Sequence, residues 1–310
     1  MGTRTSSFGA GKRESHDASD FYARFTPPVV STDETINPCS AADRLIVGDA
    51  RDMSDVDDNS VALVVTSPPY FAGKEYEVSL GEGGVPKDYL DYLGMLRDVF
   101  AECVRVLEPG GRIAVNVANL GRKPYRSLAG DVTTILQDEL ALLLRGEIVW
   151  VKAKGMSGST AFGSYLKASS PVLRDVSERV VVASKGRFNR AVNEKDRIER
   201  GLPNESTITK EEFFAATLDV WEMRPESARR VQHPAPFPVA LPERFIHLYT
   251  YVGDVVLDPF LGSGSTAVAA ARTGRHYVGY DLDPEYVAKA EQRIVDEGAP
   301  VEPAPATADD

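Results

Sequence analysis

The sequence predicts an α/β protein built on a doubly wound, mostly parallel sheet that is interrupted by an insert. Short apolar runs with the length of buried strands alternate with longer amphipathic segments over most of the 310 residues. Several of these runs end in Asp, Ser or Gly, and the ligands of parallel α/β sheets bind at the carboxyl ends of the strands. The composition, 43% apolar and 26% charged, is sufficient for a sizeable core. A functional site is therefore expected where the predicted strands end.

The first half of the chain predicts alternating strands and helices after a polar start. Residues 1–40 are rich in Ser, Thr, Asp and Pro without a sustained apolar period, which indicates a disordered or loosely docked arm. The elements expected next are strands at 44–47 and 61–65, a helix over 86–107, a turn at 108–111, a strand at 112–117, a helix over 127–144 and a strand at 147–152. This alternation predicts parallel strands joined by helices.

The second half of the chain leaves the alternation and then returns to it. Residues 154–230 are loop-rich and basic, and we interpret them as an insert into a main domain of residues 41–153 and 231–297. Residues 298–310 have the composition of a disordered tail. The elements expected in this half are a strand at 178–183, a helix around Phe213 and Phe214, a helix over 236–251, a strand at 255–257, a helix after Gly264, a strand at 276–280 and a helix over 284–296.

The net charge of −11 hides a basic middle region. Residues 120–232 hold 19 Lys and Arg against 15 Asp and Glu, and residues 145–200 hold 12 against 6. Such a region can bind a polyanion locally, although a solvated surface explains the same charges. The two cysteines and four histidines lack metal-ligand spacing, so we expect no metal. No apolar run approaches the roughly 18 residues of a membrane span, so we expect a cytoplasmic protein without a membrane partner.

The segment V-V-L-D-P-F-L-G-S-G-S-T at 255–266 predicts a nucleoside-binding turn between a strand and a helix. Glycines at such a turn let a ligand approach the backbone, and the helix N-terminus offers free N–H groups. The next predicted strand ends in Asp281, whose carboxylate is placed to accept ribose hydroxyls. NAD and S-adenosylmethionine both fit this pattern. The candidate cofactor residues are Asp258, Pro259, Phe260, Gly262, Gly264, Ser265, Thr266 and Asp281.

The run V-V-T-S-P-P-Y at 64–70 favours S-adenosylmethionine over NAD, because T-S-P-P-Y resembles the catalytic motif of DNA amino-methyltransferases. In the same way, D-P-F-L-G-S-G-S-T resembles their S-adenosylmethionine motif, and Y-D-L-D-P-E-Y from Tyr280 resembles their acidic ribose strand. G-D-A-R-D-M, which contains Asp49, resembles the strand end beside the cofactor adenine. H-P-A-P-F-P, which begins at His233, resembles the segment that lines the cofactor site. The motifs span about residues 44–296 in the permuted order of the family's beta group.

This resemblance implies a Rossmann-like class I methyltransferase sheet, S-adenosylmethionine as cofactor and double-stranded DNA as substrate. The insert at 154–230 is then the candidate target-recognition region, and a restriction endonuclease and a second copy of the chain are candidate partners. In this family Ser before Pro-Pro leans toward N4 of cytosine, whereas Asp or Asn leans toward N6 of adenine. Ser67 therefore favours cytosine, with N6 of adenine as the alternative. A methyltransferase of RNA or of a protein amide, and a silent DNA-binding relative, also remain open.

The chemistry of amine methylation gives the catalytic motif its expected roles. An exocyclic amine is a poor nucleophile because its lone pair is delocalised into the ring, and acceptors that hold both N–H bonds direct the lone pair at the methyl group. Ser67 Oγ and the Pro68 carbonyl are suited to be these acceptors, because Pro68 and Pro69 fix the backbone without offering competing N–H groups. Tyr70 is suited to stack on a base flipped out of the duplex.

Basic residues outside these motifs are the candidate DNA contacts, although a solvated surface explains each of them as well. Lys74 follows the catalytic motif, and Arg122 and Lys123 lie in N-L-G-R-K-P-Y-R. The candidates in the insert are Arg174, Arg179, Arg187 and Arg190. Trp150 and Trp221 are expected in the core.

Overall fold

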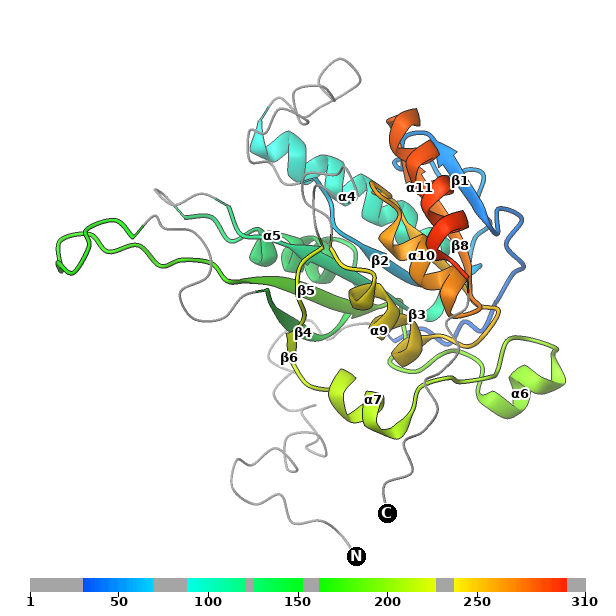
Figure 1. Cartoon of the computed structure of the whole chain (residues 1–310). Coiled ribbons are helices and arrows are strands. Elements are labelled where there is room, and N and C mark those ends of the chain that lie inside the picture. The colour runs from blue at the N-terminus through cyan, green and yellow to red at the C-terminus, as the bar shows by residue number, and fades with distance from the viewer. Residues whose placement is uncertain (1–29, 70–87, 121–124, 153–161, 227–236, 300–310) are drawn as a thin grey trace, which may run out of the picture. The chain divides into compact units, whose positions relative to one another are not determined.

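An eight-stranded sheet in the order β1-β8-β7-β2-β3-β5-β4-β6 is the core of the protein (Figure 1). The computed structural model describes residues 30–69, 88–120, 125–152, 162–226 and 237–299, which apart from Val30 belong to the unit Ser31–Asp310. Its strands are β1 Arg44–Val47, β2 Val61–Thr66, β3 Leu107–Val117, β4 Leu143–Val151, β5 Ser177–Ser184, β6 Val220–Glu222, β7 Val255–Asp258 and β8 His276–Asp281. Neighbouring strands are parallel except that β5 is antiparallel to both β3 and β4. The predicted, mostly parallel sheet is confirmed.

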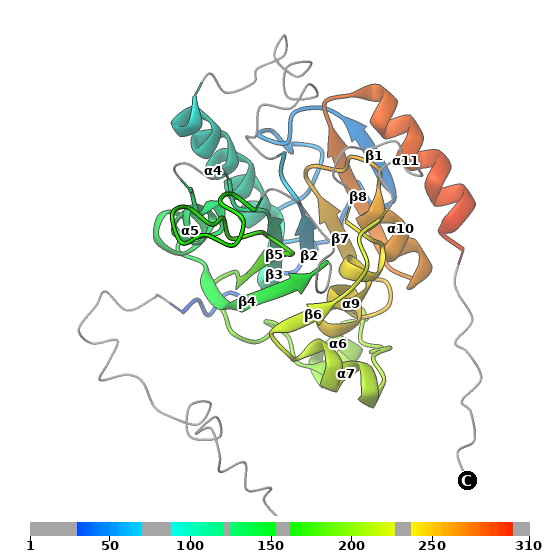
Figure 2. The ribbon, with the colours of Figure 1, turned by 60° about the vertical axis from the view of Figure 1, so that its left-hand side comes forward.

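Helices cover both faces of this sheet, with α4 and α5 on one face and α9, α10 and α11 on the other (Figure 2). The helices are α4 Tyr89–Val106, α5 Leu128–Thr134 with its π-helical continuation η2 Ile135–Glu139, α6 Glu194–Glu199, α7 Lys210–Ala216, α9 Ala240–Tyr249, α10 Ser265–Arg272 and α11 Pro284–Glu297. No helix in the described part of the chain is long and apolar enough to cross a membrane.

Strand β2 shows why its sequence is an unbroken apolar run. Successive side chains of a strand point to opposite faces of the sheet. Val64 therefore packs in the cluster that contains α4, whereas Leu63 and Val65 pack in the cluster that contains α9 and α10. Because both faces are covered by helices, no position of β2 is left for a polar residue until the strand ends.

Some element boundaries differ from those that the sequence predicts. The turn expected at 108–111 is part of β3, where the register with β2 shifts as at a β-bulge and Gly110 takes a φ of 80°. The helix expected to reach residue 144 ends at Glu139, because the chain from Leu143 onward pairs with β5 as β4. The expected core positions of Trp150 and Trp221 are confirmed, since each is 1% exposed.

The insert predicted at 154–230 is not a separate structural unit. It contributes β5, which lies between β3 and β4, and β6 at the edge of the sheet. Its residues 162–176 leave the sheet as a loop that is closed by a bridge between Gly163 and Pro171 and projects away from the strands (Figure 1). The sheet thus runs through a segment that the sequence places outside the regular alternation.

The arm predicted at the start of the chain is ordered in its described part. The backbone N–H of Ser31 donates to the carbonyl of Gly186 at 2.7 Å, and polar side chains up to residue 40 bond to the loop ahead of β2. Of the two alternatives that the sequence leaves open, a disordered or a docked arm, these contacts favour docking for residues 31–40. Residues 1–29 of the arm and 300–310 of the tail lie outside the described residues.

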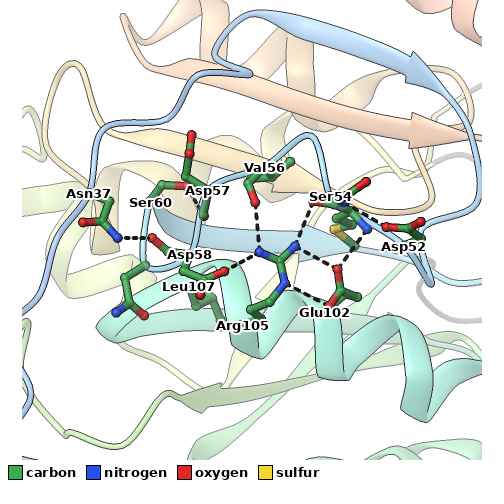
Figure 3. A network of polar contacts seen from close by, with 12 residues as sticks. Asn37, Asp52, Ser54, Val56, Asp57, Asp58, Ser60, Glu102, Arg105 and Leu107 are labelled. Carbon is green, nitrogen blue, oxygen red and sulfur yellow. Dashed lines mark hydrogen bonds and ion pairs between the residues drawn. The ribbon is translucent and has the colours of Figure 1, made fainter.

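The crossover between β1 and β2 is held by the guanidinium of Arg105, near the end of α4 (Figure 3). Its Nη1 donates to the Val56 carbonyl at 3.0 Å, and its Nη2 donates to the Met53 carbonyl at 2.8 Å. The same guanidinium forms ion pairs with Glu102 at 2.8 Å and with Asp58 at 2.5 Å. A loop without helix or strand is thereby fixed to α4 by charge-assisted hydrogen bonds.

Candidate active site

Four neighbouring strands end at one edge of the sheet and bring predicted site residues together. Strands β1, β8, β7 and β2 are parallel neighbours, so their carboxyl ends meet there. Asp49 follows β1, Asp281 ends β8, Asp258 ends β7 and Ser67 follows β2. Three of these positions carry carboxylates, so this edge is suited to a ligand with hydrogen-bond donors or positive charge.

Asp258 is buried and ties three segments of this edge together. Its carboxylate accepts the Thr66 hydroxyl at 2.7 Å, the Thr266 hydroxyl at 2.9 Å and the Phe260 N–H at 3.1 Å. Burial raises the pKa of this carboxyl to about 6, although the three donors favour its charged form. Because only 1% of Asp258 is exposed, its place in the structure is that of an organiser of β2, β7 and α10. The sequence predicts Asp258 and Thr266 as cofactor contacts, but the structure bonds them to each other.

The glycines of the predicted turn are required by the chain itself. Gly262 and Gly264 have φ angles of 50° and 76°, in the left-handed region that favours glycine. A Cβ at Gly264 would lie 2.8 Å from the Cβ of Ala290 in α11. Ser265 Oγ donates to the Phe237 carbonyl at 2.9 Å, which fixes the start of α10. The turn therefore needs these glycines independently of a ligand. The neighbouring Pro259 is buried.

Asp281 is the acceptor best placed for a nucleoside. Its two carboxylate oxygens accept the N–H groups of Gly262 and Asp283, each at 2.9 Å. Burial raises the pKa of Asp281, and no cation of the described residues is among the groups that shift it. Each oxygen keeps a lone pair for a further donor, as the hydroxyls of a ribose require.

The groups beside Asp281 also fit a nucleoside ligand. The Gly48 N–H donates to the Asp281 carbonyl at 2.9 Å, so the segment with Asp49 lies next to it. Hydrogen bonds from Arg51 lower the pKa of Asp49, and the two form an ion pair of 2.5 Å. Among the described residues no side chain caps the first turn of α10, so its N–H groups are suited to an anion or a polar ligand.

The residues of the catalytic motif leave the sheet directly after β2. Ser67 and Pro69 are half-buried and Pro68 is buried. The Tyr92 hydroxyl of α4 donates to the Pro69 carbonyl at 2.8 Å, and Asn116 Nδ2 of β3 donates to Ser67 Oγ at 3.4 Å. The motif is therefore held from both sides, by a helix and by the neighbouring strand.

Three supporting residues were not predicted from the sequence: Thr66, Tyr92 and Asn116. Each has a signal that is weak when taken alone. Thr66 ends an otherwise apolar strand, and Asn116 follows the apolar residues 113–115 of β3; a buried polar side chain in such a place needs a partner. Tyr92 is a phenol on the buried face of an amphipathic helix, with 2% of its surface exposed. Only the arrangement of the strands identifies the partners of these residues.

The structure places some of the candidate DNA contacts near the edge of the sheet that holds Ser67 and others away from it. Arg179 pairs with Glu147 at 3.9 Å near the start of β5, at the same edge as Ser67, and Arg174 lies 4.6 Å from the ring of Phe162 in the projecting loop. Both remain candidates.

Two other arginines of the insert are not at this edge. Because β5 is antiparallel, Arg187 follows its end at the opposite edge, where it bonds to the Asp33 carbonyl at 2.9 Å. Arg190 is buried in an ion pair of 3.0 Å with Asp254. The structure therefore places Arg187 and Arg190 away from the edge that holds Ser67, and their contact with DNA stays a prediction. The predicted site residues that lie outside the described residues are Tyr70, Lys74, Arg122, Lys123 and His233.

Comparison with known families and proteins gives a consistent result. A family model described as DNA methylase matches residues 61–292. The type II methyltransferase M.MjaI of Methanocaldococcus jannaschii is 30% identical over 283 residues, which cover 81% of this chain and 90% of that protein. The type II methyltransferase M.HpaI of Haemophilus parainfluenzae is 30% identical over 259 residues, which cover 81% of this chain and 74% of that protein.

Solved structures show the same similarity in three dimensions. A DNA modification methylase of Thermus thermophilus in complex with S-adenosyl-L-methionine superposes with a TM-score of 0.64 at 30% identity, covering 82% of this chain and 93% of the other. The PvuII DNA methyltransferase, a cytosine-N4-specific enzyme, superposes with a TM-score of 0.60 at 20% identity, covering 84% and 90% of the two chains. At 20% identity, the match to the PvuII enzyme is evidence for the fold only.

Proposed function

The chain belongs to the DNA methylase family of S-adenosylmethionine-dependent amino-methyltransferases, and we propose that it methylates N4 of cytosine at a specific sequence in duplex DNA. The observation that carries the choice of base is the serine at position 67, directly after β2 and in front of Pro68. The family match also favours DNA over the RNA and protein-amide substrates that the sequence leaves open.

The cofactor is S-adenosylmethionine, which when bound supplies an electrophilic sulfonium methyl group. We assign its ribose hydroxyls to Asp281 and its adenine end to the segment around Asp49, which adjoin each other at the sheet edge. The uncapped first turn of α10 is suited to its carboxylate. The buried Asp258 acts indirectly in this assignment, by holding β2 and α10 in place.

The target amine is held by acceptors of the catalytic motif. Ser67 Oγ and the Pro68 carbonyl each accept one N–H of the amine, which turns its lone pair toward the methyl group. The Pro69 carbonyl is already bonded to Tyr92, which anchors the loop and leaves the Pro68 carbonyl for the substrate. No strong base is needed, because a methylated aryl-ammonium group loses its proton readily to water. Stacking of Tyr70 on the flipped base remains a prediction.

The loop at 162–176 is the part of the structure best suited to read the DNA sequence. It leaves the sheet at the edge that holds Ser67, because β5 begins there. It exposes Tyr165, Leu166 and Leu173 by 67%, 87% and 92%, and its half-buried Arg174 lies over the ring of Phe162. Exposed aromatic and apolar side chains beside an arginine are suited to contact bases and phosphates. A cognate restriction endonuclease, a homodimer and a cytoplasmic location also remain predictions.

The target base is tested by product analysis. Duplex DNA containing all short sequence contexts is incubated with the protein and S-adenosylmethionine, digested to nucleosides and analysed by mass spectrometry. We expect N4-methylcytosine and no N6-methyladenine, and single-molecule sequencing of the same DNA then gives the recognition site. N6-methyladenine without N4-methylcytosine would transfer the assignment to adenine, the alternative that the family allows. DNA incubated with Ser67→Ala serves as the control for methylation acquired from the expression host.

A further inference from the structure

We propose that Asn116, Glu178 and Lys152 form a positioning chain that holds the Ser67 hydroxyl in place for methyl transfer. The inference rests on the acceptor role proposed for Ser67 and extends it to three neighbouring strands. These strands follow β2 in the sheet in the order β3, β5, β4 (Figure 2). None of the three residues belongs to the motifs that the sequence singles out.

The chain is continuous in space although its members are far apart in the sequence. Asn116 Nδ2 lies 3.4 Å from Ser67 Oγ and 2.6 Å from Glu178 Oε2, and the other oxygen of Glu178 accepts from Lys152 Nζ. The antiparallel β5 makes this possible, because its first residues lie beside the last residues of β3 and β4. Asn116 and Glu178 are only 1% and 7% exposed, so water does not replace these contacts.

The hydrogen-bonding capacity of each group determines its role. The two N–H bonds of the Asn116 amide are directed to Glu178 and Ser67, and a flipped amide would put its oxygen against the Glu178 carboxylate. The carboxylate therefore fixes which end of the amide meets Ser67. A serine oxygen has two lone pairs. Asn116 donates to one of them, which fixes the position of the hydroxyl oxygen relative to β3.

Lys152 completes the chain by neutralising Glu178. A buried carboxylate without an opposite charge is strongly unfavourable, so an unpaired Glu178 would move toward solvent and release the amide. The Lys152 side chain is 31% exposed, so its ammonium keeps contact with water while it reaches the buried carboxylate. A second charged pair joins the same two strands: Arg179 and Glu147, at 3.9 Å, with side chains 35% and 45% exposed. That pair does not lead to Ser67, so it provides a matched control.

A double-mutant cycle in single-turnover kinetics tests whether Asn116 acts through Ser67. We expect Asn116→Ala to lower the rate of methyl transfer by roughly 10- to 100-fold, because a misplaced acceptor loses the alignment of the amine. The dissociation constant of S-adenosylmethionine and the melting temperature are expected to stay close to those of the wild type. Ser67→Ala lacks the hydroxyl group that Asn116 positions, so removing Asn116 as well should have no further effect. The rate of Ser67→Ala/Asn116→Ala should therefore equal that of Ser67→Ala within about 2-fold.

The isosteric variant Glu178→Gln tests the next link without removing volume. We expect a rate lower by about 10-fold, because a neutral amide can present either end to Asn116 and so no longer fixes its orientation. Glu147→Gln, the same change in the exposed pair, should leave the rate unchanged.

The inference is overturned if the effects of Ser67→Ala and Asn116→Ala multiply, or if Glu178→Gln and Glu147→Gln behave alike. Wild-type activity in Ser67→Ala would overturn the acceptor role and the positioning chain together. If the product is N6-methyladenine, the proposed target base is corrected to adenine. The double-mutant cycle of Ser67 and Asn116 still tests the positioning chain in that case. The two proposals therefore fail by different measurements.

Discussion

Two groups of buried carboxylates, at opposite edges of the sheet, are stabilised in opposite ways. At the amino-end edge, the carboxylates of Glu108 and Asp254 are ion-paired with Arg190 and Arg197, and the side chains of all four are at most 10% exposed. At the carboxyl-end edge, the carboxylate of Asp258 is held by two hydroxyls and one N–H. The carboxylates of Glu108 and Asp254 are therefore neutralised by cations, whereas the carboxylate of Asp258 is stabilised by neutral donors.

This difference separates a structural edge from a ligand-binding edge. A carboxylate paired with a guanidinium has its charge cancelled and its geometry fixed. A carboxylate held by neutral donors keeps its negative charge, at the expense of a raised pKa. Such an edge retains affinity for donors and cations, and S-adenosylmethionine carries both hydroxyl groups and a sulfonium charge. Three substitutions outside the catalytic motif test this comparison.

The largest expected effect comes from Asp254→Asn at the amino-end edge. Two buried guanidiniums would lose a shared partner that lies 3.0 Å from Arg190 and 3.1 Å from Arg197. We expect the free energy of unfolding to fall by about 3–5 kcal/mol, as when one member of a buried ion pair is removed. Urea unfolding measures this loss. The affinity of the folded fraction for S-adenosylmethionine, measured by calorimetry, should not change; a large loss of affinity would contradict the separation of the two edges.

A smaller effect, dependent on pH, is expected for Asp258→Asn. The pKa of Asp258 is about 6 in the folded protein against 3.8 for the ordinary group. A raised folded-state pKa gives stability that is fully present below about pH 4 and is lost as the pH rises through about 6. Between these limits the wild type should lose about 2–3 kcal/mol through this group.

Asp258→Asn lacks this titrating group, so its unfolding free energy does not contain this loss. As the pH rises, the stability of the variant should therefore increase relative to that of the wild type. Urea unfolding at pH values of about 4.5, 6 and 7.5, which bracket the titration, measures that difference. Asp281, whose pKa is also raised, titrates in both proteins, and its charge contributes to the raised pKa of Asp258. A difference that does not depend on pH would mean that Asp258 is not held as the structure shows.

The smallest effect is expected for Arg105→Gln in the crossover network of Figure 3. The guanidinium is 31% exposed, so solvent screening reduces the value of its ion pairs with Glu102 and Asp58. We expect a loss of about 1–2 kcal/mol, mainly from its hydrogen bonds to backbone carbonyls. The matched control on the same helix is Arg97→Gln, whose ion pair with Asp98 is exposed and should contribute little to stability. Equal melting temperatures for the two variants would show that the network does not hold the crossover.

Much of the fold could be predicted from the sequence because strand and helix periods are local. The runs at 61–65 and 276–280 were identified as strands from their apolar pattern alone, and the structure extends each by one residue. The boundary at Leu143 was missed because residues 140–146 are apolar enough for either a helix or a strand, and pairing with β5 decides between them.

The candidate site was predictable where a motif carries its own chemistry. Ser67 with its two prolines, and Asp281 at the end of a strand, point to amine methylation and to a ribose acceptor without knowledge of the fold. The internal role of Asp258 was not predictable, because it depends on hydroxyls supplied by residues 66 and 266, which are far apart in the sequence.

The sequence by itself therefore determined the class of the protein, its cofactor motif and the serine on which the proposal of cytosine rests, since each depends on short stretches with a fixed local pattern. Only the tertiary structure decided that β5 runs antiparallel between β3 and β4. That reversal places Glu178 beside Asn116 and moves Arg187 to the far edge of the sheet. Its cause is long-range, because the order and direction of strands follow from which faces are buried together and not from the period of any single strand.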